Sequence, residues 1–292
     1  MKYFRPTSLD DALAIRRSED VTLLAGATDI YPAYVGRKAW GDPTHKDILD
    51  LSAVPGLRAI EIGEHDIRLG ALVTWSDLAR ADLASQFDGI RAAAREIGGA
   101  QIQNRGTIVG NACTASPAGD GIPNLLALDA SFEIAGTSAR LVSAQDFFTG
   151  YRQVNCRADE IVTGIRIPRR QARSAFAKLG ARRYLVISIA MVAVVIETAE
   201  DERITAARIA VGACSAVAQR LTGLEESLVG LQLADASRWV SPEHFTSLQP
   251  IDDIRASAAY RQATSLTLVR DVLVGMAGGS TGSPARQHHP HK

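Results

Sequence analysis

Hydrophobic and polar positions alternate along the chain in short segments, and the spacing in each segment predicts one kind of secondary structure. Residues 10–17, capped by Thr7 or Ser8, and residues 74–83, opened by Thr74, have the periodicity and caps of helices. Residues 21–25 form an apolar run typical of a buried strand, and residues 47–51 and 57–72 are β-like stretches broken by Gly and Pro. Strands and helices are therefore mixed from the start of the chain.

The same mixture continues to residue 168. Residues 90–97 predict a helix that ends at Gly98 and Gly99, and residues 124–130 predict a short buried helix. Strands are predicted over residues 131–134 and 139–142, and residues 160–167 alternate apolar and polar side chains as a half-buried strand does. Residues 168–173 are polar and basic, which we interpret as a solvated boundary between two parts of the chain.

Beyond this boundary, strands are predicted over residues 174–179, 188–198 and 204–214, followed by helices over residues 215–229 and 254–276. This order of elements indicates an α+β fold. Residues 278–292 are rich in Gly, Ser, Pro and His and are expected to be a disordered tail.

Composition narrows the classes of protein to consider. The 292 residues are 46% hydrophobic and 22% charged, as in an ordinary globular protein with room for two or three domains. The 32 basic and 32 acidic side chains cancel, which argues against binding to nucleic acid or to an anionic membrane. No apolar run is long enough to span a bilayer, no targeting signal is visible, and the three cysteines suit neither a disulfide framework nor zinc. We therefore expect a cytoplasmic protein.

Two loops, at residues 23–32 and 105–120, carry the candidate chemistry. Each follows an apolar or helical stretch and then changes to Gly, Thr, Ser and Asn, which exposes backbone N–H groups as a cradle for an anion. A diphosphate needs two such walls, whereas one such loop alone is ordinarily just a turn. The chain has neither a G-x-G-x-x-G fingerprint nor a P-loop, so a dinucleotide would have to be held in another way.

Other motifs lack the structural context that their chemistry needs. Residues 278–282 match the letters of a hydrolase nucleophile elbow but lie in the expected tail, and the tail histidines, His288, His289 and His291, have no fixed geometry. The sequence therefore predicts no catalytic residue and no metal ligand in this chain.

Five segments, read together, resemble one protein family. They are Phe4-Arg5-Pro6-x-Ser8-Leu9-x-x-Ala12-Leu13, Leu24-Ala25-Gly26-x-Thr28-Asp29, Asn104-Arg105-Gly106-Thr107-Ile108-x-Gly110-Asn111, Ala115-Ser116-Pro117-x-x-Asp120 and Asp253-Ile254-Arg255-x-Ser257-x-x-Tyr260-Arg261. In this order they are similar to the FAD-binding medium subunit of the molybdenum hydroxylases, the family of xanthine and carbon monoxide dehydrogenases.

The resemblance implies a PCMH-type fold in which two subdomains, residues 1–55 and 56–170, clamp FAD. A C-terminal α+β domain, an antiparallel sheet with helices at residues 174–277, would follow and precede the tail at 278–292. Residue by residue, the first loop and the start of the second would hold the diphosphate, Asp120 would contact the adenosine part, and Val162, Lys178 and Tyr184 would lie at the flavin. The implied cofactor-binding residues are Leu23, Leu24, Ala25, Gly26, Ala27, Thr28, Asp29, Ile30, Thr107, Ile108, Val109, Gly110, Asn111, Ser116, Asp120, Val162, Lys178 and Tyr184.

Two departures from the family pattern affect this expectation. Ala27 and Val109 each replace a family glycine, and because a positive φ would strain them, we expect a negative φ at both. Some relatives carry an iron–sulfur cluster in this subunit, but three dispersed cysteines are too few to hold one. FAD is therefore expected to be the sole redox centre of the chain.

The function implied by the resemblance is electron transfer. FAD would take electrons from a small subunit with two [2Fe–2S] clusters and pass them to NAD, quinone or oxygen, while a large molybdopterin subunit, in a heterotrimer that dimerises, oxidises an N-heterocyclic substrate. Two alternatives stay open: a scaffold subunit that has lost the flavin, and a stand-alone FAD oxidoreductase.

Overall fold

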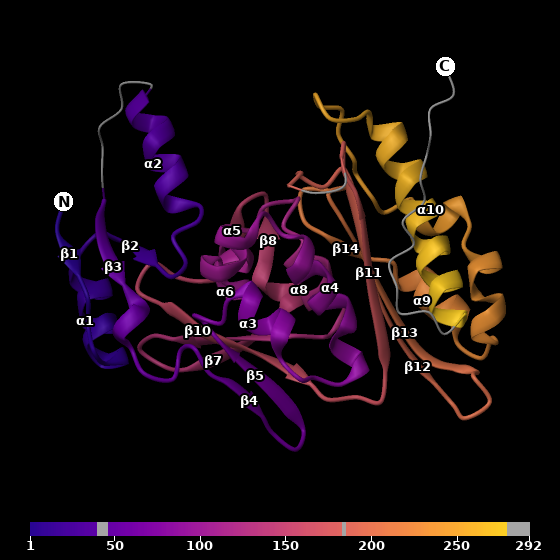
Figure 1. Cartoon of the computed structure of the whole chain (residues 1–292), viewed down its shortest axis with the longest axis horizontal. Coiled ribbons are helices and arrows are strands. Elements are labelled where there is room, and N and C mark those ends of the chain that lie inside the picture. The colour runs from indigo at the N-terminus through magenta and orange to yellow at the C-terminus, as the bar shows by residue number, and fades with distance from the viewer. Residues whose placement is uncertain (40–45, 183–184, 279–292) are drawn as a thin grey trace.

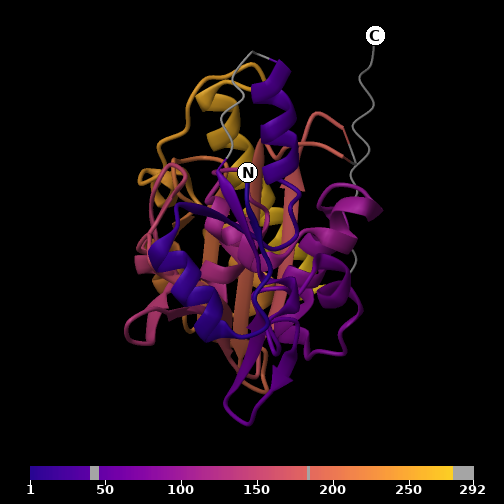
Figure 2. The same cartoon turned by 90° about the vertical axis from the view of Figure 1, so that its left-hand side faces the viewer.

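In the computed structural model, which describes residues 1–39, 46–182 and 185–278, three sheets follow one another along the long axis of the molecule (Figure 1). The first is parallel, with strand order β1-β3-β2. It contains β1 (Tyr3–Phe4), β2 (Val21–Leu24) and β3 (Asp47–Asp50), joined by α1 (Leu9–Ser18) and α2 (Ile30–Ala39). Ser8 is the cap of α1, because its hydroxyl accepts the N–H of Asp11. Helix α2 was not predicted. It rises at the upper edge of the molecule in both views (Figures 1 and 2).

The second sheet is antiparallel, in the order β4-β5-β10-β6-β7. Its strands are β4 (Ile60–Ile62), β5 (Asp66–Gly70), β6 (Ser131–Ala135), β7 (Arg140–Ser143) and β10 (Ile161–Pro168). The prediction that residues 160–167 form a half-buried strand is wrong, because β10 is the central strand of the sheet and its first five residues are all buried. Arg166, near the end of the strand, is partly exposed and forms ion pairs with Glu133 and Asp66.

Short helices lie between the second and third sheets (Figure 1). They are α3 (Trp75–Arg80), α4 (Asp88–Glu96), α5 (Ala100–Arg105), α6 (Ile108–Thr114), α7 (Gly121–Ala127) and α8 (Ala144–Phe147), and a small hairpin of β8 (Phe148–Gly150) and β9 (Gln153–Val154) packs beside them. Thr74 forms a capping box with Asp77 at the start of α3, and Gly98 adopts φ 53° just after α4, so both predicted helix boundaries are confirmed.

The third sheet is antiparallel and is buried on both faces. Its strands, in order, are β11 (Arg173–Leu179), β12 (Ala190–Thr198), β13 (Ile204–Gly212) and β14 (Gln219–Arg220). Along β12, Met191, Ala193 and Val195 belong to the core that includes the second sheet and its short helices. The alternate residues belong to a second core with α9 (Thr222–Leu228) and α10 (Ala258–Ala277). Because both faces of this sheet are buried, apolar residues occupy successive positions of β12 and do not alternate with polar ones.

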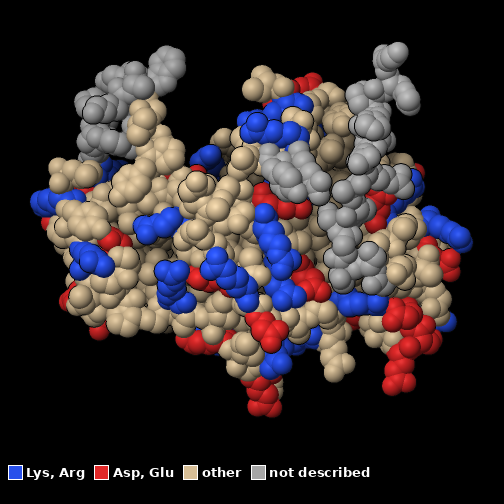
Figure 3. All heavy atoms as spheres, viewed as in Figure 1, with Lys and Arg blue, Asp and Glu red and all other residues tan. Residues whose placement is uncertain are grey.

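Two expectations for the C-terminal part are corrected. Residues 215–229 are not one helix, because Gln219 and Arg220 pair with β13 and only Thr222–Leu228 is helical; sheet pairing outweighs local propensity here. The basic stretch at residues 168–173 is less solvated than expected, because Arg170 pairs with Asp129 and Arg173 begins β11. Figure 3 shows acidic and basic side chains interspersed over the visible face, and no one sign of charge dominates it.

Candidate functional site

The first predicted wall, residues 25–29, connects β2 to α2. Ala27 has φ 65°, so the expected negative φ is wrong at this residue. The chain must reverse from the strand into the helix here, and the carbonyl of Ala27 accepts the N–H of Tyr31 in the first turn of α2. Left-handed backbone costs an alanine about 1–2 kcal/mol. The N–H groups of residues 26–29 donate to no other residue in the described part of the chain.

The second predicted wall is a helix start. Thr107 is buried and caps α6, its hydroxyl accepting the N–H of Gly110 at 3.0 Å, while its carbonyl accepts the N–H of Asn111. The N–H of Ile108 donates to the carbonyl of Val73. Val109 lies within the right-handed helix, as expected, and its N–H has no acceptor among the residues the structure describes.

The two walls touch each other. A Cβ atom added to Gly26 would lie 2.0 Å from the carbonyl oxygen of Arg105, and one added to Gly106 would lie 3.4 Å from the Thr28 hydroxyl. The carboxylate of Asp29 accepts the hydroxyl of Thr114 at 2.8 Å, at the far end of α6. Segments eighty residues apart in sequence therefore meet at one place, which lies at the foot of α2 beside α5 and α6 in Figure 1. Figure 3 shows this edge of the molecule hollowed between α2 and the C-terminal part.

The rest of the second loop folds back against α6. Ala115 ends the helix in the left-handed conformation at φ 45°, and the amide oxygen of Asn111 accepts the N–H of Gly121 at 3.3 Å. This bond holds the loop that carries Ser116, whose hydroxyl accepts the N–H of Ala118 at 3.4 Å. The amide nitrogen of Asn111 is left as the donor that could face a ligand.

Asp120 and Lys178, which the resemblance assigns to different parts of FAD, contact each other. The Nζ of Lys178 lies 2.6 Å from a carboxylate oxygen of Asp120, and both side chains are more than 90% buried. Ser188 donates its hydroxyl to the other oxygen at 2.6 Å, and Lys178 also donates to the carbonyl of Glu96 at 3.2 Å. Any ligand that reaches one of the two residues therefore also lies next to the other.

Sequence reasoning missed Ser188, which sits inside an apolar run and carries no motif. Of the remaining predicted residues, Val162 is buried in β10 opposite Ile134, inside the second sheet. Tyr184, the tail histidines and the five-residue motif that begins at Gly278 lie outside the described residues, apart from Gly278 itself. No group of three or more His, Cys, Asp or Glu side chains that could hold a metal occurs in residues 1–39, 46–182 and 185–278.

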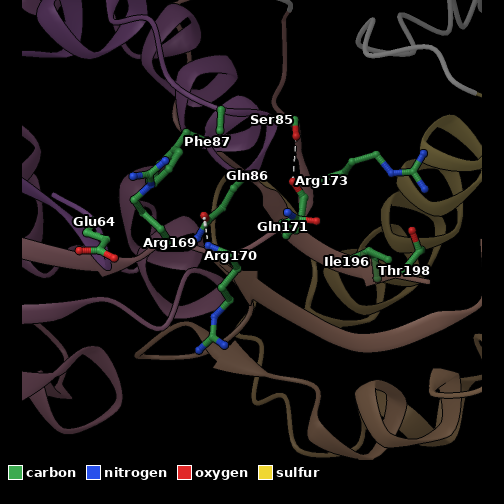
Figure 4. A pocket seen from close by; sticks show the side chains of 12 residues that line it. Glu64, Ser85, Gln86, Phe87, Arg169, Arg170, Gln171, Arg173, Ile196 and Thr198 are labelled. Atoms are coloured by element: carbon green, nitrogen blue, oxygen red, sulfur yellow. Dashed lines mark hydrogen bonds between the residues drawn. The ribbon is translucent and has the colours of Figure 1, made fainter. Parts of the chain in front are cut away.

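A pocket of about 590 Å³ lies away from the two walls, between the second and third sheets (Figure 4). It is lined by Arg169, Arg170 and Arg173, but their guanidinium groups point away from one another. Arg169 donates to the carbonyl of Gly63 at 2.7 Å, and the other two are ion-paired with acidic side chains. These partners hold the three guanidinium groups apart, and the arginines do not converge on an anion.

Comparison with known proteins places the whole chain in one family. Residues 1–170 match the family model described as the FAD binding domain in molybdopterin dehydrogenase, and residues 175–275 match that of the CO dehydrogenase flavoprotein C-terminal domain. The nicotine 6-hydroxylase medium subunit of Paenarthrobacter nicotinovorans is 34% identical over 279 residues, which cover 94% of this chain and 96% of that protein. The carbon monoxide dehydrogenase medium chain of Hydrogenophaga pseudoflava is 25% identical, over 93% and 95% of the two chains.

Solved structures agree with this placement. Reconstituted CO dehydrogenase from Oligotropha carboxidovorans has a chain that superposes with a TM-score of 0.85 at 27% identity, covering 94% of this chain and 96% of that chain. Quinoline 2-oxidoreductase from Pseudomonas putida 86 shares the fold, with a TM-score of 0.85 at 23% identity over 97% and 98% of the two chains. None of the described helices is long and apolar enough to cross a membrane. The chain therefore belongs to the FAD-binding medium subunits of the molybdenum hydroxylases, a family of oxidoreductases.

Proposed function

We propose that this chain relays electrons through a non-covalently bound FAD whose diphosphate lies between residues 24–29 and residues 107–111. The observation that carries the proposal is the contact of Gly26 with Arg105 and Gly106, which joins two walls of polar backbone. The uncommitted N–H groups of residues 26–29 and of Val109 supply donors for phosphate oxygens. Thr28 and the amide nitrogen of Asn111 add side-chain donors at the same place.

Asp120 and Lys178 are proposed to face the flavin together, because they form one buried pair. FAD, when bound, exchanges electrons one or two at a time, and so connects one-electron iron–sulfur clusters with a two-electron acceptor. The charge of the Lys178 ammonium is balanced by Asp120, so its proposed role is to offer an N–H donor to a neighbouring ring. Ser188 and the carbonyl of Glu96 hold that ammonium and its carboxylate in position.

The electrons are proposed to come from [2Fe–2S] clusters on a small partner subunit and, before that, from a molybdopterin subunit that oxidises an N-heterocyclic compound. In this proposal, oxidation of the substrate takes place on the molybdopterin subunit. The name of the nicotine 6-hydroxylase relative and the Ser116-Pro117 form of the second loop support an N-heterocycle as the substrate class. NAD, quinone and oxygen are the candidate acceptors.

FAD titration tests the proposed site directly. Gly110→Val places a branched side chain against the Thr107 hydroxyl, which is 2.8 Å from the position of an added Cβ. Asn111→Ala removes one charge-assisted hydrogen bond, which is worth about 1.5–3 kcal/mol, or roughly ten- to hundredfold in Kd. If both variants bind FAD as tightly as wild type, the start of α6 is not a phosphate wall.

Purification of the untagged protein from its own host separates the proposed relay from its two alternatives. The relay requires a flavin spectrum and two companions, one rich in iron–sulfur clusters and one with molybdopterin. Co-purification without any flavin, even after reconstitution with FAD, would identify a scaffold. A chain that turns over an organic substrate without either companion would identify a stand-alone oxidoreductase.

A further inference from the structure

Helix α7 is buried along its whole length and has a carboxylate at each end. All seven residues, Gly121–Ala127, are buried, and the helix packs against β12, β13 and β14 of the third sheet. Asp120 directly precedes the helix, and Asp129 lies in the turn that follows it. Asp120 pairs with Lys178 on β11, whereas Asp129 pairs with arginines on β13 and β14. Ion pairs therefore hold both ends of α7 against the third sheet.

The ion pairs of Asp129 belong to a larger group of charges at the end of α7 that is remote from Lys178. Its carboxylate lies 3.0 Å from the guanidinium of Arg220 and 3.1 Å from that of Arg170, and it also accepts a bond from Arg208. Two further carboxylates contact these arginines. We call these six residues the charge cluster: Arg170, Arg208, Arg220, Asp129, Glu197 and Glu225.

Within the charge cluster, Asp129 joins segments that the other two carboxylates do not join. Glu197 on β12 pairs with β13 at 2.7 Å, and Glu225 on α9 pairs with β14 at 2.7 Å, so both bonds stay within the C-terminal part. Asp129 reaches the same two strands from the turn after α7. Arg220 also donates to the carbonyl of Leu126, in the last turn of the helix, at 3.1 Å. The pairs made by Asp129 therefore fix α7 relative to the third sheet.

The other end of α7 is part of the proposed FAD site. The amide oxygen of Asn111, in the second wall, accepts the N–H of Gly121, and the side chain of Asn124 donates to the carbonyl of Asp120 at 3.0 Å. The N–H of Leu128 in turn donates to the carbonyl of Asn124. One hydrogen-bonded helix, about 10 Å long, thus connects the turn that carries the charge cluster to Asp120. A displacement of this turn is passed to Asp120, because so short a helix moves as a unit.

We propose that Asp129 is a positioning residue for the flavin, because by fastening α7 to β13 and β14 it sets where Asp120 meets Lys178. Asp120 and Lys178 come from the two parts of the chain that α7 and the third sheet hold together, so their separation depends on how these parts are docked. Partial separation of such a buried pair leaves two poorly compensated charges, and exact docking is therefore needed. The proposal rests on the proposed FAD site and extends it to a residue that does not touch the cofactor.

The test is a mutant cycle on FAD affinity in the full-length, flavin-free chain. Asp129→Asn is introduced into the wild type and into a pair-free background, Lys178→Met with Asp120→Asn, and each protein is titrated with FAD. We expect Asp129→Asn to raise the Kd at least about fivefold in the wild type and less than about twofold in the pair-free background. An unchanged Kd in the wild type, or the same fold-change in both backgrounds, would overturn the proposal.

Glu197→Gln is the matched control, because it removes one carboxylate of the same charge cluster and leaves the bonds of Asp129 in place. It should change the Kd for FAD by less than about twofold. A loss of affinity equal to that of Asp129→Asn would show that the charge of the cluster matters and the fastening of α7 does not, which would overturn the proposal.

Hydrogen exchange in the absence of FAD provides a readout that does not depend on the pair-free background. Amides of residues 120–124, at the end of α7 nearer to Lys178, should exchange about tenfold faster in Asp129→Asn and at the wild-type rate in Glu197→Gln. Faster exchange confined to residues 128–130 would show that α7 does not transmit the displacement, and would overturn the proposal.

Failure of the proposed FAD site is visible before Asp129 is changed. In that case, the wild-type chain takes up no FAD, or the pair-free background binds FAD as tightly as the wild type. Either result would also overturn the positioning role, because that role acts through the pair of Asp120 and Lys178.

Discussion

Replacement of Gly26 by alanine should separate the two walls of the proposed FAD site. The added Cβ would lie 2.0 Å from the carbonyl oxygen of Arg105 and 2.7 Å from its carbonyl carbon. Both atoms belong to the backbone, so no side-chain rotation relieves the overlap. Non-bonded atoms are in contact at about 3.5 Å, and the loops must therefore move apart by roughly 1 Å or more.

This movement should affect both stability and FAD affinity. Overpacking against a well-ordered neighbour typically costs about 1–3 kcal/mol of folding free energy. A shift of that size would also lose at least one charge-assisted hydrogen bond to a phosphate, about 1.5–3 kcal/mol. We expect the Kd for FAD to rise roughly ten- to hundredfold in Gly26→Ala.

Titration of the flavin-free protein with FAD, followed by flavin fluorescence, measures the change, and thermal unfolding without FAD measures the structural cost. Gly36→Ala is the matched control, because Gly36 lies in α2 and an added Cβ there would meet nothing within 4 Å. That substitution should stabilise the protein by about 0.5–1 kcal/mol and leave FAD affinity unchanged. Wild-type affinity in Gly26→Ala would refute the argument that the contact of the two walls forms the site.

Three further predictions concern buried or partly buried charges. Lys178→Met leaves the Asp120 carboxylate without its cation and should lower the free energy of unfolding, measured in urea, by about 3–5 kcal/mol, and Asp120→Asn added to it should restore part of the loss. Asn tolerates the φ of 50° at residue 129, so Asp129→Asn removes only the charge that Arg170, Arg208 and Arg220 share. It should lower the free energy of unfolding by roughly 2 kcal/mol. An unchanged free energy of unfolding would show that the other partners of these arginines suffice. Ion pairing, chiefly with Arg140, lowers the pKa of Glu160 to about 2 from 4.5, so its contribution is complete above pH 4.5 and lost as the pH falls towards 2. Glu160→Gln should therefore lower Tm at pH 7 but much less at pH 3, and an equal effect at both values would contradict the assignment.

The periodicity of the chain predicted most elements because those elements satisfy local rules. Helix α1 begins at a serine cap, α3 begins at a capping box, and β12 is a nearly continuous run of apolar residues. Where a prediction failed, a distant contact was the cause. Gln219 and Arg220 are strand residues only because β13 offers them partners, and Arg170 is covered only because Asp129 reaches it from the turn after α7.

The candidate site also combines features set by local sequence with features set by distant contacts. The sequence alone determined the family, the two loops rich in Gly and Thr, and the residue types that suit a diphosphate, since these depend on local composition and order. Only the tertiary structure decided that Gly26 lies against Arg105, that Ala27 is left-handed and that Lys178 pairs with Asp120. Such contacts join residues about sixty to eighty positions apart, and no local pattern encodes them, because their energies exist only once packing has brought the segments together.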